Sequence, residues 1–183
     1  MDKKKQQEKS GLRSFLSSLL IAVVIAFAIL QVIKPVIVSG PSMQPTLQDG
    51  DYLIVSKVAY LLDSPKRGDV IVFTYEEDGQ REFIVKRVIA VPGDTICITG
   101  GDVFINGKKD PQRYTKDHVT DEEVAQRTVA KGHYFCMGDN RFNSMDSRDE
   151  EIGEVAEDLI VGRVAVRLLP IGKIGPVRSV SIP

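Results

Sequence analysis

An apolar segment near the N-terminus constrains the fold of this 183-residue chain more than any other feature. Phe15 to Ile33 contains no charged residue and consists mostly of Leu, Ile, Val, Ala and Phe. As an α-helix it would be about 28 Å long, close to the thickness of about 30 Å of a bilayer's hydrocarbon core. We therefore predict a transmembrane anchor over residues 15–33, a basic cytoplasmic arm over residues 1–14 and a separate extracytoplasmic domain over residues 34–183.

The charges before the anchor predict its orientation. They are mostly basic (Lys3, Lys4, Lys5, Lys9 and Arg13, against Asp2 and Glu8). Basic residues favour the cytoplasmic side, so we expect a single-pass protein of the cell membrane with its main domain outside. The alternative is a cleavable signal peptide, because Ala26-Phe27-Ala28 has the form of a processing site. That triplet lies inside the apolar run rather than after it, which favours an uncleaved anchor.

The charge balance and the positions of the cysteines and histidines exclude nucleic-acid binding and a metal site. The formal net charge is -1, with 24 Lys and Arg against 25 Asp and Glu, so no basic field suggests nucleic-acid binding. Cys97 and Cys136 lie in apolar, strand-like contexts, where we expect free thiols, and a disulfide between them is the alternative. His118 and His133 are far apart and lack ligand-spaced partners, so we expect no metal site and no cofactor.

Beyond the anchor, short β-branched runs between turn signals predict a mainly β domain. The expected strands cover residues 51–55, 69–73, 82–91, 103–105, 134–137 and 159–169. Asn106-Gly107 predicts a tight hairpin with both turn residues at positive φ. Many short strands of this kind are typical of antiparallel sheets or a partly closed barrel.

Two segments of this domain deviate from the strand pattern. Thr120 to Gln126 has some helical period. The longer stretch Pro111 to Lys131 is polar and charged, which is typical of a solvated surface loop. The alternative is that this stretch shapes the approach to a site.

Ser42 is a candidate nucleophile close to the membrane. It stands between Gly40-Pro41 and Met43-Gln44-Pro45, a stiff, turn-rich context that can present a hydroxyl rather than bury it. It lies nine residues beyond Ile33, so a fully extended link reaches only about 30 Å from the membrane boundary.

Lys86 is the candidate base, because both histidines lie in surface-like contexts. Alternation along its predicted strand places Ile84, Lys86 and Val88 on one face and Arg87 on the other. At a pKa of about 10.4, only about one lysine in 2,500 is neutral at pH 7. A useful base needs a pKa roughly 2 to 3 units lower, which desolvation by aliphatic neighbours can supply. Without Ser42, Lys86 is interpreted more simply as a strand lysine that reaches solvent.

A third polar segment, residues 138–148, contains further candidates. It opens with a Gly-Asp-Asn turn, and Asp146 and Arg148 can form a charge pair that stiffens it. Ser144 can hydrogen-bond the amine of Lys86 and aim it at Ser42. Taken alone, the segment is interpreted more simply as an ordinary polar loop.

Together these segments resemble the type I (leader) signal peptidases, specifically the short Gram-positive kind with one N-terminal anchor. Residues 39–47 resemble the family's nucleophile box, residues 86–94 its lysine box, and residues 138–148 its Gly-Asp-Asn…Ser-x-Asp-Ser-Arg box. The resemblance covers nearly the whole chain. It implies a Ser-Lys dyad serine endopeptidase that removes signal peptides from exported preproteins on the outer side of the membrane, through an acyl-enzyme.

The resemblance also implies a role for each matched residue. Ser42 is the nucleophile and its backbone N–H an oxyanion donor, Lys86 is the general base, and Ser144 orients the lysine. Asp139, Asp146 and Arg148 brace the site. Gly40 stands where some members carry a serine that assists the oxyanion, so this role falls to backbone N–H groups.

Members of that family bind the substrate as an added strand and accept small side chains at the first and third residues before the cut. The candidates for the two shallow pockets are Val38, Met43, Ile84 and Val85. Judged by residue type alone, all four are interpreted as core residues.

The expected partners are signal-peptide-bearing preproteins, the lipid bilayer and the protein-export translocase. Anchoring enzyme and substrate in one bilayer raises their effective concentration. Two other functions stay open: a self-cleaving repressor-like Ser-Lys peptidase, and a non-enzymatic membrane-anchored β-domain. The first would be favoured by a DNA-binding module at the N-terminus, where this chain has its apolar segment.

Overall fold

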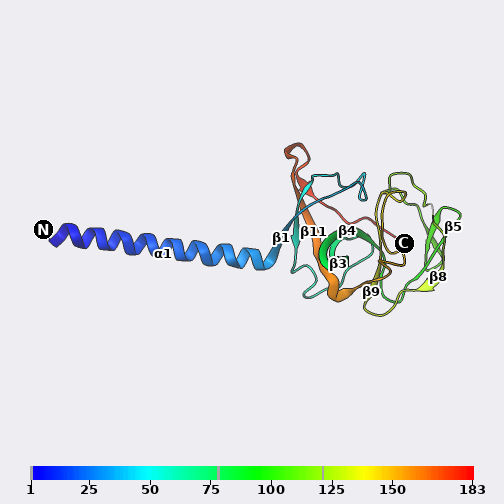
Figure 1. The fold of residues 1–183 in the computed structure, drawn as a ribbon, viewed down its shortest axis with the longest axis horizontal. Coiled ribbons are helices and arrows are strands. Elements are labelled where there is room, and N and C mark those ends of the chain that lie inside the picture. The colour runs from blue at the N-terminus through cyan, green and yellow to red at the C-terminus, as the bar shows by residue number, and fades with distance from the viewer. Residues whose placement is uncertain (1, 78, 121) are drawn as a thin grey trace.

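A single long helix precedes a β-rich body in the computed structural model, which describes residues 2–77, 79–120 and 122–183. Helix α1 (Asp2–Val32) projects away from the body (Figure 1). Its segment Phe15–Val32 has a mean hydropathy of 2.6, is not buried, and is long and apolar enough to cross a membrane. The helix ends one residue before the predicted end of the anchor, because Ile33 already pairs with Ser56 in a sheet.

The larger sheet contains eight antiparallel strands. They are β1 (Ile33–Ile37), β2 (Tyr52–Ser56), β3 (Val70–Glu77), β4 (Gln80–Ala90), β9 (His133–Met137), β10 (Val155–Ala156), β11 (Ile160–Leu169) and β12 (Gly175–Pro176). The strand order is β1-β2-β11-β3-β4-β9-β10, with β12 added beside β11. The sheet is open from β1 to β10, so the predicted mainly β, antiparallel class is confirmed without a closed barrel.

A smaller four-stranded sheet lies at the end of the molecule far from α1 (Figure 1). Its strands are β5 (Thr95–Thr99), β6 (Asp102–Ile105), β7 (Lys108–Asp110) and β8 (Val124–Thr128), in the order β7-β6-β5-β8. Asn106 and Gly107 have φ values of 51° and 74°, as predicted for a tight hairpin. Two short 3-10 helices, η1 (Glu157–Leu159) and η2 (Ile171–Lys173), flank β11.

The prediction of a helical period over Thr120 to Gln126 is wrong. Val124–Thr128 forms β8 instead and pairs with β5. A helix of seven residues would be marginal in water, whereas pairing with β5 satisfies the backbone of the segment. The polar stretch from Pro111 to Lys131 is a solvated loop only in part, because Gln112, Thr115 and Thr120 are buried.

The core anchors the segment that carries Ser42. Met43 and Leu47 are buried in one apolar cluster with Leu53 of β2 and Val85 of β4. The segment between β1 and β2 is therefore held by packing on the side away from solvent. Cys97 of β5 and Cys136 of β9 are free thiols, as expected.

Candidate active site

Ser42 lies in a tight turn between β1 and β2. Gly40 has φ +86°, a left-handed conformation that glycine adopts without steric cost. On the other side, the Leu47 N–H donates a hydrogen bond of 2.9 Å to the Met43 carbonyl oxygen. The half-buried Ser42 is thus presented on a turn closed by local hydrogen bonds and by its buried neighbours.

Lys86 meets Ser42 from β4. A hydrogen bond of 2.9 Å joins Lys86 Nζ to Ser42 Oγ, although 44 residues separate them in sequence. Lys86 is only 4% exposed. This burial lowers the pKa of Lys86 below its ordinary value of 10.5, because desolvation disfavours the ammonium form. The arrangement favours a neutral amine within reach of a hydroxyl proton.

The charges around Lys86 act in both directions on its pKa. The Arg148 guanidinium lowers it further, while the carboxylates of Asp146 and Asp139 raise it. The net direction is downward, so burial outweighs the attraction of the two carboxylates.

Ser144 makes a different hydrogen bond from the expected one. Its Oγ donates a hydrogen bond of 2.7 Å to Asp146 Oδ2, and within the described residues no hydrogen bond joins it to Lys86 Nζ. An ionised carboxylate is a stronger acceptor than an amine, which explains this preference. Ser144 still borders the dyad: a Cβ on Gly138 would lie 2.2 Å from Ser144 Oγ and 2.5 Å from the Ser42 carbonyl oxygen. Only glycine permits this close approach.

Asp146 organises the loop that carries Ser144. It accepts a hydrogen bond of 2.8 Å from the Gly138 N–H and bonds of 2.8 and 3.0 Å from the Arg148 guanidinium. Both side chains of this predicted charge pair are fully buried. A buried ionic pair with its hydrogen bonds satisfied holds the loop in one conformation.

A second buried ion pair, between Arg87 and Asp139, involves an arginine that the sequence analysis did not assign. Two hydrogen bonds of 2.8 and 2.6 Å join the guanidinium to the carboxylate, and both side chains are 0% exposed. Asp139 Oδ2 also accepts a hydrogen bond of 2.5 Å from Thr46 Oγ1. The pair connects β4 to the turn of Ser42. An arginine on the inner face of a buried strand requires a carboxylate, which is the signal that could have identified it.

Arg141 extends this bracing to the segment after β7. Its buried guanidinium donates hydrogen bonds of 2.5 Å to Gln112 Oε1 and 3.0 Å to Thr120 Oγ1. A third bond, of 3.0 Å, reaches the Gly138 carbonyl oxygen. Part of the stretch 111–131 therefore supports the loop of residues 138–148.

A cleft of about 230 Å³ opens at the dyad. All four residues suggested for substrate pockets line it, together with Ser42 and Lys86 (Val38, Met43, Ile84 and Val85). Val38, Met43 and Val85 are 5%, 1% and 8% exposed, so they form a closed apolar wall. The cleft is small, and three of its apolar lining residues are buried in the core.

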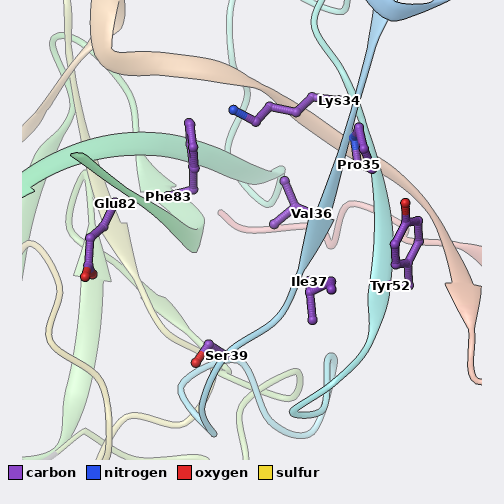
Figure 2. A pocket seen from close by; sticks show the side chains of 8 residues that line it. All are labelled: Lys34, Pro35, Val36, Ile37, Ser39, Tyr52, Glu82 and Phe83. Carbon is purple, nitrogen blue, oxygen red and sulfur yellow. The ribbon is translucent and has the colours of Figure 1, made fainter. Parts of the chain in front are cut away.

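A wider groove, of about 630 Å³, continues from this cleft towards α1. It shares Ile37, Ser39, Glu82 and Phe83 with the cleft and adds Lys34, Pro35, Val36 and Tyr52. Figure 2 shows the side chain of Lys34 reaching from β1 towards Phe83 on β4. Lys34 Nζ lies 3.2 Å from the centroid of that ring. The groove thus runs from the end of the apolar helix to the dyad.

Comparison with known proteins identifies the family. The model of the family described as signal peptidase, peptidase S26, matches residues 12–169, a range that contains the dyad and the loop of residues 138–148. The chain belongs to the peptidase S26 signal peptidase family. The family predicted from the three sequence boxes is therefore confirmed.

This S26 member is similar to several named peptidases. Signal peptidase I P of Bacillus subtilis subsp. natto is 35% identical over 181 residues, covering 93% of this chain and 96% of that protein. Signal peptidase I T of Bacillus subtilis strain 168 is 39% identical over 155 residues, 79% of each chain. A crystal structure of a signal peptidase I from Enterococcus faecalis V583 is 30% identical, with a TM-score of 0.45, covering 55% of this chain and 97% of that chain.

Proposed function

We propose that this chain is a membrane-anchored serine endopeptidase that removes signal peptides from exported preproteins. The observation that carries the proposal is the hydrogen bond of 2.9 Å between Ser42 Oγ and a Lys86 amine that is 4% exposed. A hydroxyl becomes a useful nucleophile when an adjacent base removes its proton, and a desolvated lysine is such a base.

The two side chains perform a two-step hydrolysis. Neutral Lys86 takes the proton of Ser42 as Oγ attacks the scissile carbonyl carbon, and the resulting ammonium donates a proton to the leaving amine. An ester links Ser42 to the signal peptide at this stage. Water then attacks the ester, again with Lys86 as base, and the released Ser42 regains its proton.

The backbone supplies the oxyanion donor. Within the described part of the chain the Ser42 N–H donates no hydrogen bond, so it is available to the developing negative charge. Such a donor, held by the turn before the reaction begins, stabilises the transition state without reorganisation. Asp139, Asp146, Arg148 and Ser144 act indirectly, by holding the loop and the charges around Lys86.

The open edges of two strands suit a peptide substrate. β1 is the edge of the larger sheet, and β9 pairs with β4 only from Arg87 onward. A peptide extended between β1 and residues 82–86 can add main-chain hydrogen bonds to these edges. Alternate side chains then point into the cleft of about 230 Å³, which fits small residues at the first and third positions before the cut.

The topology follows from the anchor. We place residues 1–14 in the cytoplasm, residues 15–33 across the bilayer and residues 34–183 outside. The groove starts at Lys34, two residues beyond the helix, so a signal sequence that crosses the same bilayer emerges beside it. The substrates are thus preproteins presented at the membrane surface, and the translocase stays a predicted partner.

A substrate series tests this proposal. We expect purified full-length chain in detergent to cleave a preprotein after an alanine at the first position before the cut, and phenylalanine there to slow cleavage about 100-fold or more. The reason is steric, since the cleft of about 230 Å³ must hold the peptide main chain and the side chain of the third position as well as the ring. Phenylalanine at the second position, whose side chain points away from the cleft, is the control and should be tolerated. Equal rates for both variants, measured by gel and by N-terminal sequencing, would contradict the binding mode.

A further inference from the structure

The groove of about 630 Å³ beside the cleft is larger than the cleft itself, and the binding of the first and third positions before the cut does not use it. Four residues line both spaces, so the groove continues the cleft without a break (Ile37, Ser39, Glu82 and Phe83). A substrate that lies in the cleft therefore extends its preceding residues into the groove. The occupant of the groove is this upstream part of the same peptide.

The two strands beside the cleft fix which substrate residue reaches the groove. A signal sequence enters at Lys34 and is cut at Ser42, so it runs in the direction of β1. On β4, Phe83 precedes Lys86 by three residues, a distance of about 10 Å at 3.3 Å per residue. An extended peptide covers this distance in three residues. Its fourth residue before the cut therefore lies level with Phe83.

The alternation of side chains selects the fifth residue before the cut. In an extended peptide the first, third and fifth side chains point to the same side. Since the first and third side chains enter the cleft, the fifth is the next to point to that side. At this distance from the cut it enters the groove, where Phe83 and Lys34 line the wall.

Lys34 gives this part of the groove a positive charge. Its Nζ lies over the Phe83 ring, 3.2 Å from the centroid, and this cation–π contact holds the ammonium at the groove. The side chain is half-buried, and its pKa is lowered first by burial and then by the Lys57 ammonium. No carboxylate among the described residues contributes to this shift. The charge of Lys34 is therefore left to attract a ligand.

Glu82, the acidic residue among those that line the groove, does not neutralise Lys34. Alternation along β4 places Glu82 and Phe83 on opposite faces of the strand. Figure 2 shows the Glu82 carboxylate pointing away from Lys34 and from the Phe83 ring. Glu82 is also exposed, so water and salt screen its charge more than that of the half-buried lysine. The wall that faces the fifth position is thus positive.

We propose that the groove is a subsite for the fifth residue before the cut, and that Lys34 makes this subsite favour an acidic side chain and reject a basic one. The inference rests on the proposed function and adds a specificity to the same site. Signal peptides carry their basic residues before the apolar segment, far upstream of the cut, so the lysine does not exclude them. It excludes basic segments that happen to have small residues at the first and third positions.

Three soluble peptides test this selectivity. All carry alanine at the first and third positions before the cut, and they differ only at the fifth, which is Glu, Gln or Lys. The enzymes are the purified chain in an uncharged detergent and its variants Lys34→Gln and Lys34→Glu. Lys131→Glu, at an exposed lysine outside the groove, is the matched control for the change in net charge. The quantity compared is the ratio of kcat/KM for the Glu peptide to kcat/KM for the Lys peptide, in which a general loss of activity cancels.

We expect this ratio to be about 10 for the wild type and for Lys131→Glu, because the partly buried ammonium attracts one peptide and repels the other. It should fall to about 1 in Lys34→Gln and below 1 in Lys34→Glu, with the Gln peptide intermediate in every enzyme. The ratio for the wild type should also decrease when salt is raised from about 0.05 M to about 0.5 M, because salt screens the interaction.

A ratio that is the same in the wild type and in Lys34→Gln would overturn the selectivity. A wild-type ratio below 1 would also overturn it, since the Glu82 carboxylate would then dominate the subsite. Either result leaves the proposed function intact, because the peptides are still cleaved. If the wild type cleaves none of the three peptides, the proposed function fails, and this inference fails with it.

Discussion

Ser42→Ala is expected to abolish preprotein processing. The alanine methyl group cannot form the acyl-enzyme, so only binding and polarisation of the substrate remain. Loss of a nucleophile in serine proteases lowers the rate by about 10⁴-fold or more. The measurement is gel-based cleavage of a radiolabelled preprotein by detergent-solubilised protein, in parallel with the wild type.

The controls separate catalysis from folding. Ser64→Ala removes the hydroxyl of an exposed serine away from the cleft and should retain full activity. Ser42→Ala should keep the circular dichroism spectrum and the membrane location of the wild type, because its hydroxyl supports no packing in the core. Residual cleavage within tenfold of the wild type would place the nucleophile elsewhere. A non-enzymatic β-domain would show no difference at all.

Lys86→Arg is expected to be nearly as damaging, although it keeps a positive charge. A guanidinium stays protonated at every accessible pH, so it cannot accept the Ser42 proton. We expect a loss of about 10³-fold or more, since general-base catalysis contributes 10² to 10⁴-fold and the larger group also disturbs the buried site.

Two further variants are controls for the activity measured with Lys86→Arg. Lys86→Met removes the amine while filling a similar volume, and it should be equally inactive yet fold normally. Lys109→Arg, on an exposed lysine of β7, should have no effect. Full activity in Lys86→Arg, or equal activity in Lys86→Met and the wild type, would rule out lysine as the base.

Local sequence signals predicted the parts of the molecule that depend on short stretches of chain. The helix over residues 15–32 follows from continuous apolarity, and the hairpin at Asn106-Gly107 follows from turn chemistry. The sequence also predicts the pairing of Ser42 with Lys86, because one lies in a stiff turn and the other in an aliphatic strand. Their distance of 2.9 Å fits that pairing.

The long-range polar pairs inside the site could not be predicted, because they join residues far apart in the chain, whereas the local pair of Asp146 and Arg148 was predicted. Arg87 pairs with Asp139, which is 52 residues away in the sequence, and Arg141 donates a hydrogen bond to Gln112, which is 29 residues away. Periodicity places Arg87 on a face but does not say what covers that face. The expected bond from Ser144 to Lys86 ignored a competing carboxylate only two residues away, at Asp146.

The segment 111–131 shows the limit of composition as a guide. Its charges predict a solvated loop, yet Gln112 and Thr120 are buried against the Arg141 guanidinium, and Val124 begins a strand. A few polar side chains with satisfied hydrogen bonds can be buried in a segment that is polar on average. The average polarity of the segment therefore does not reveal which of its residues brace the active-site loop.

The central claim is that the active form of the enzyme carries a neutral Lys86. Its most direct test is the pH dependence of kcat/KM for a soluble peptide substrate, which reports ionisations of the free enzyme. Burial lowers the pKa of Lys86 below 10.5, and the deprotonated amine is the active form. We therefore expect kcat/KM to rise with increasing pH and to reach its plateau at a pH below 10.5. A maximum near pH 5 followed by a decline would contradict the claim, since it would require an active form that the loss of a proton destroys.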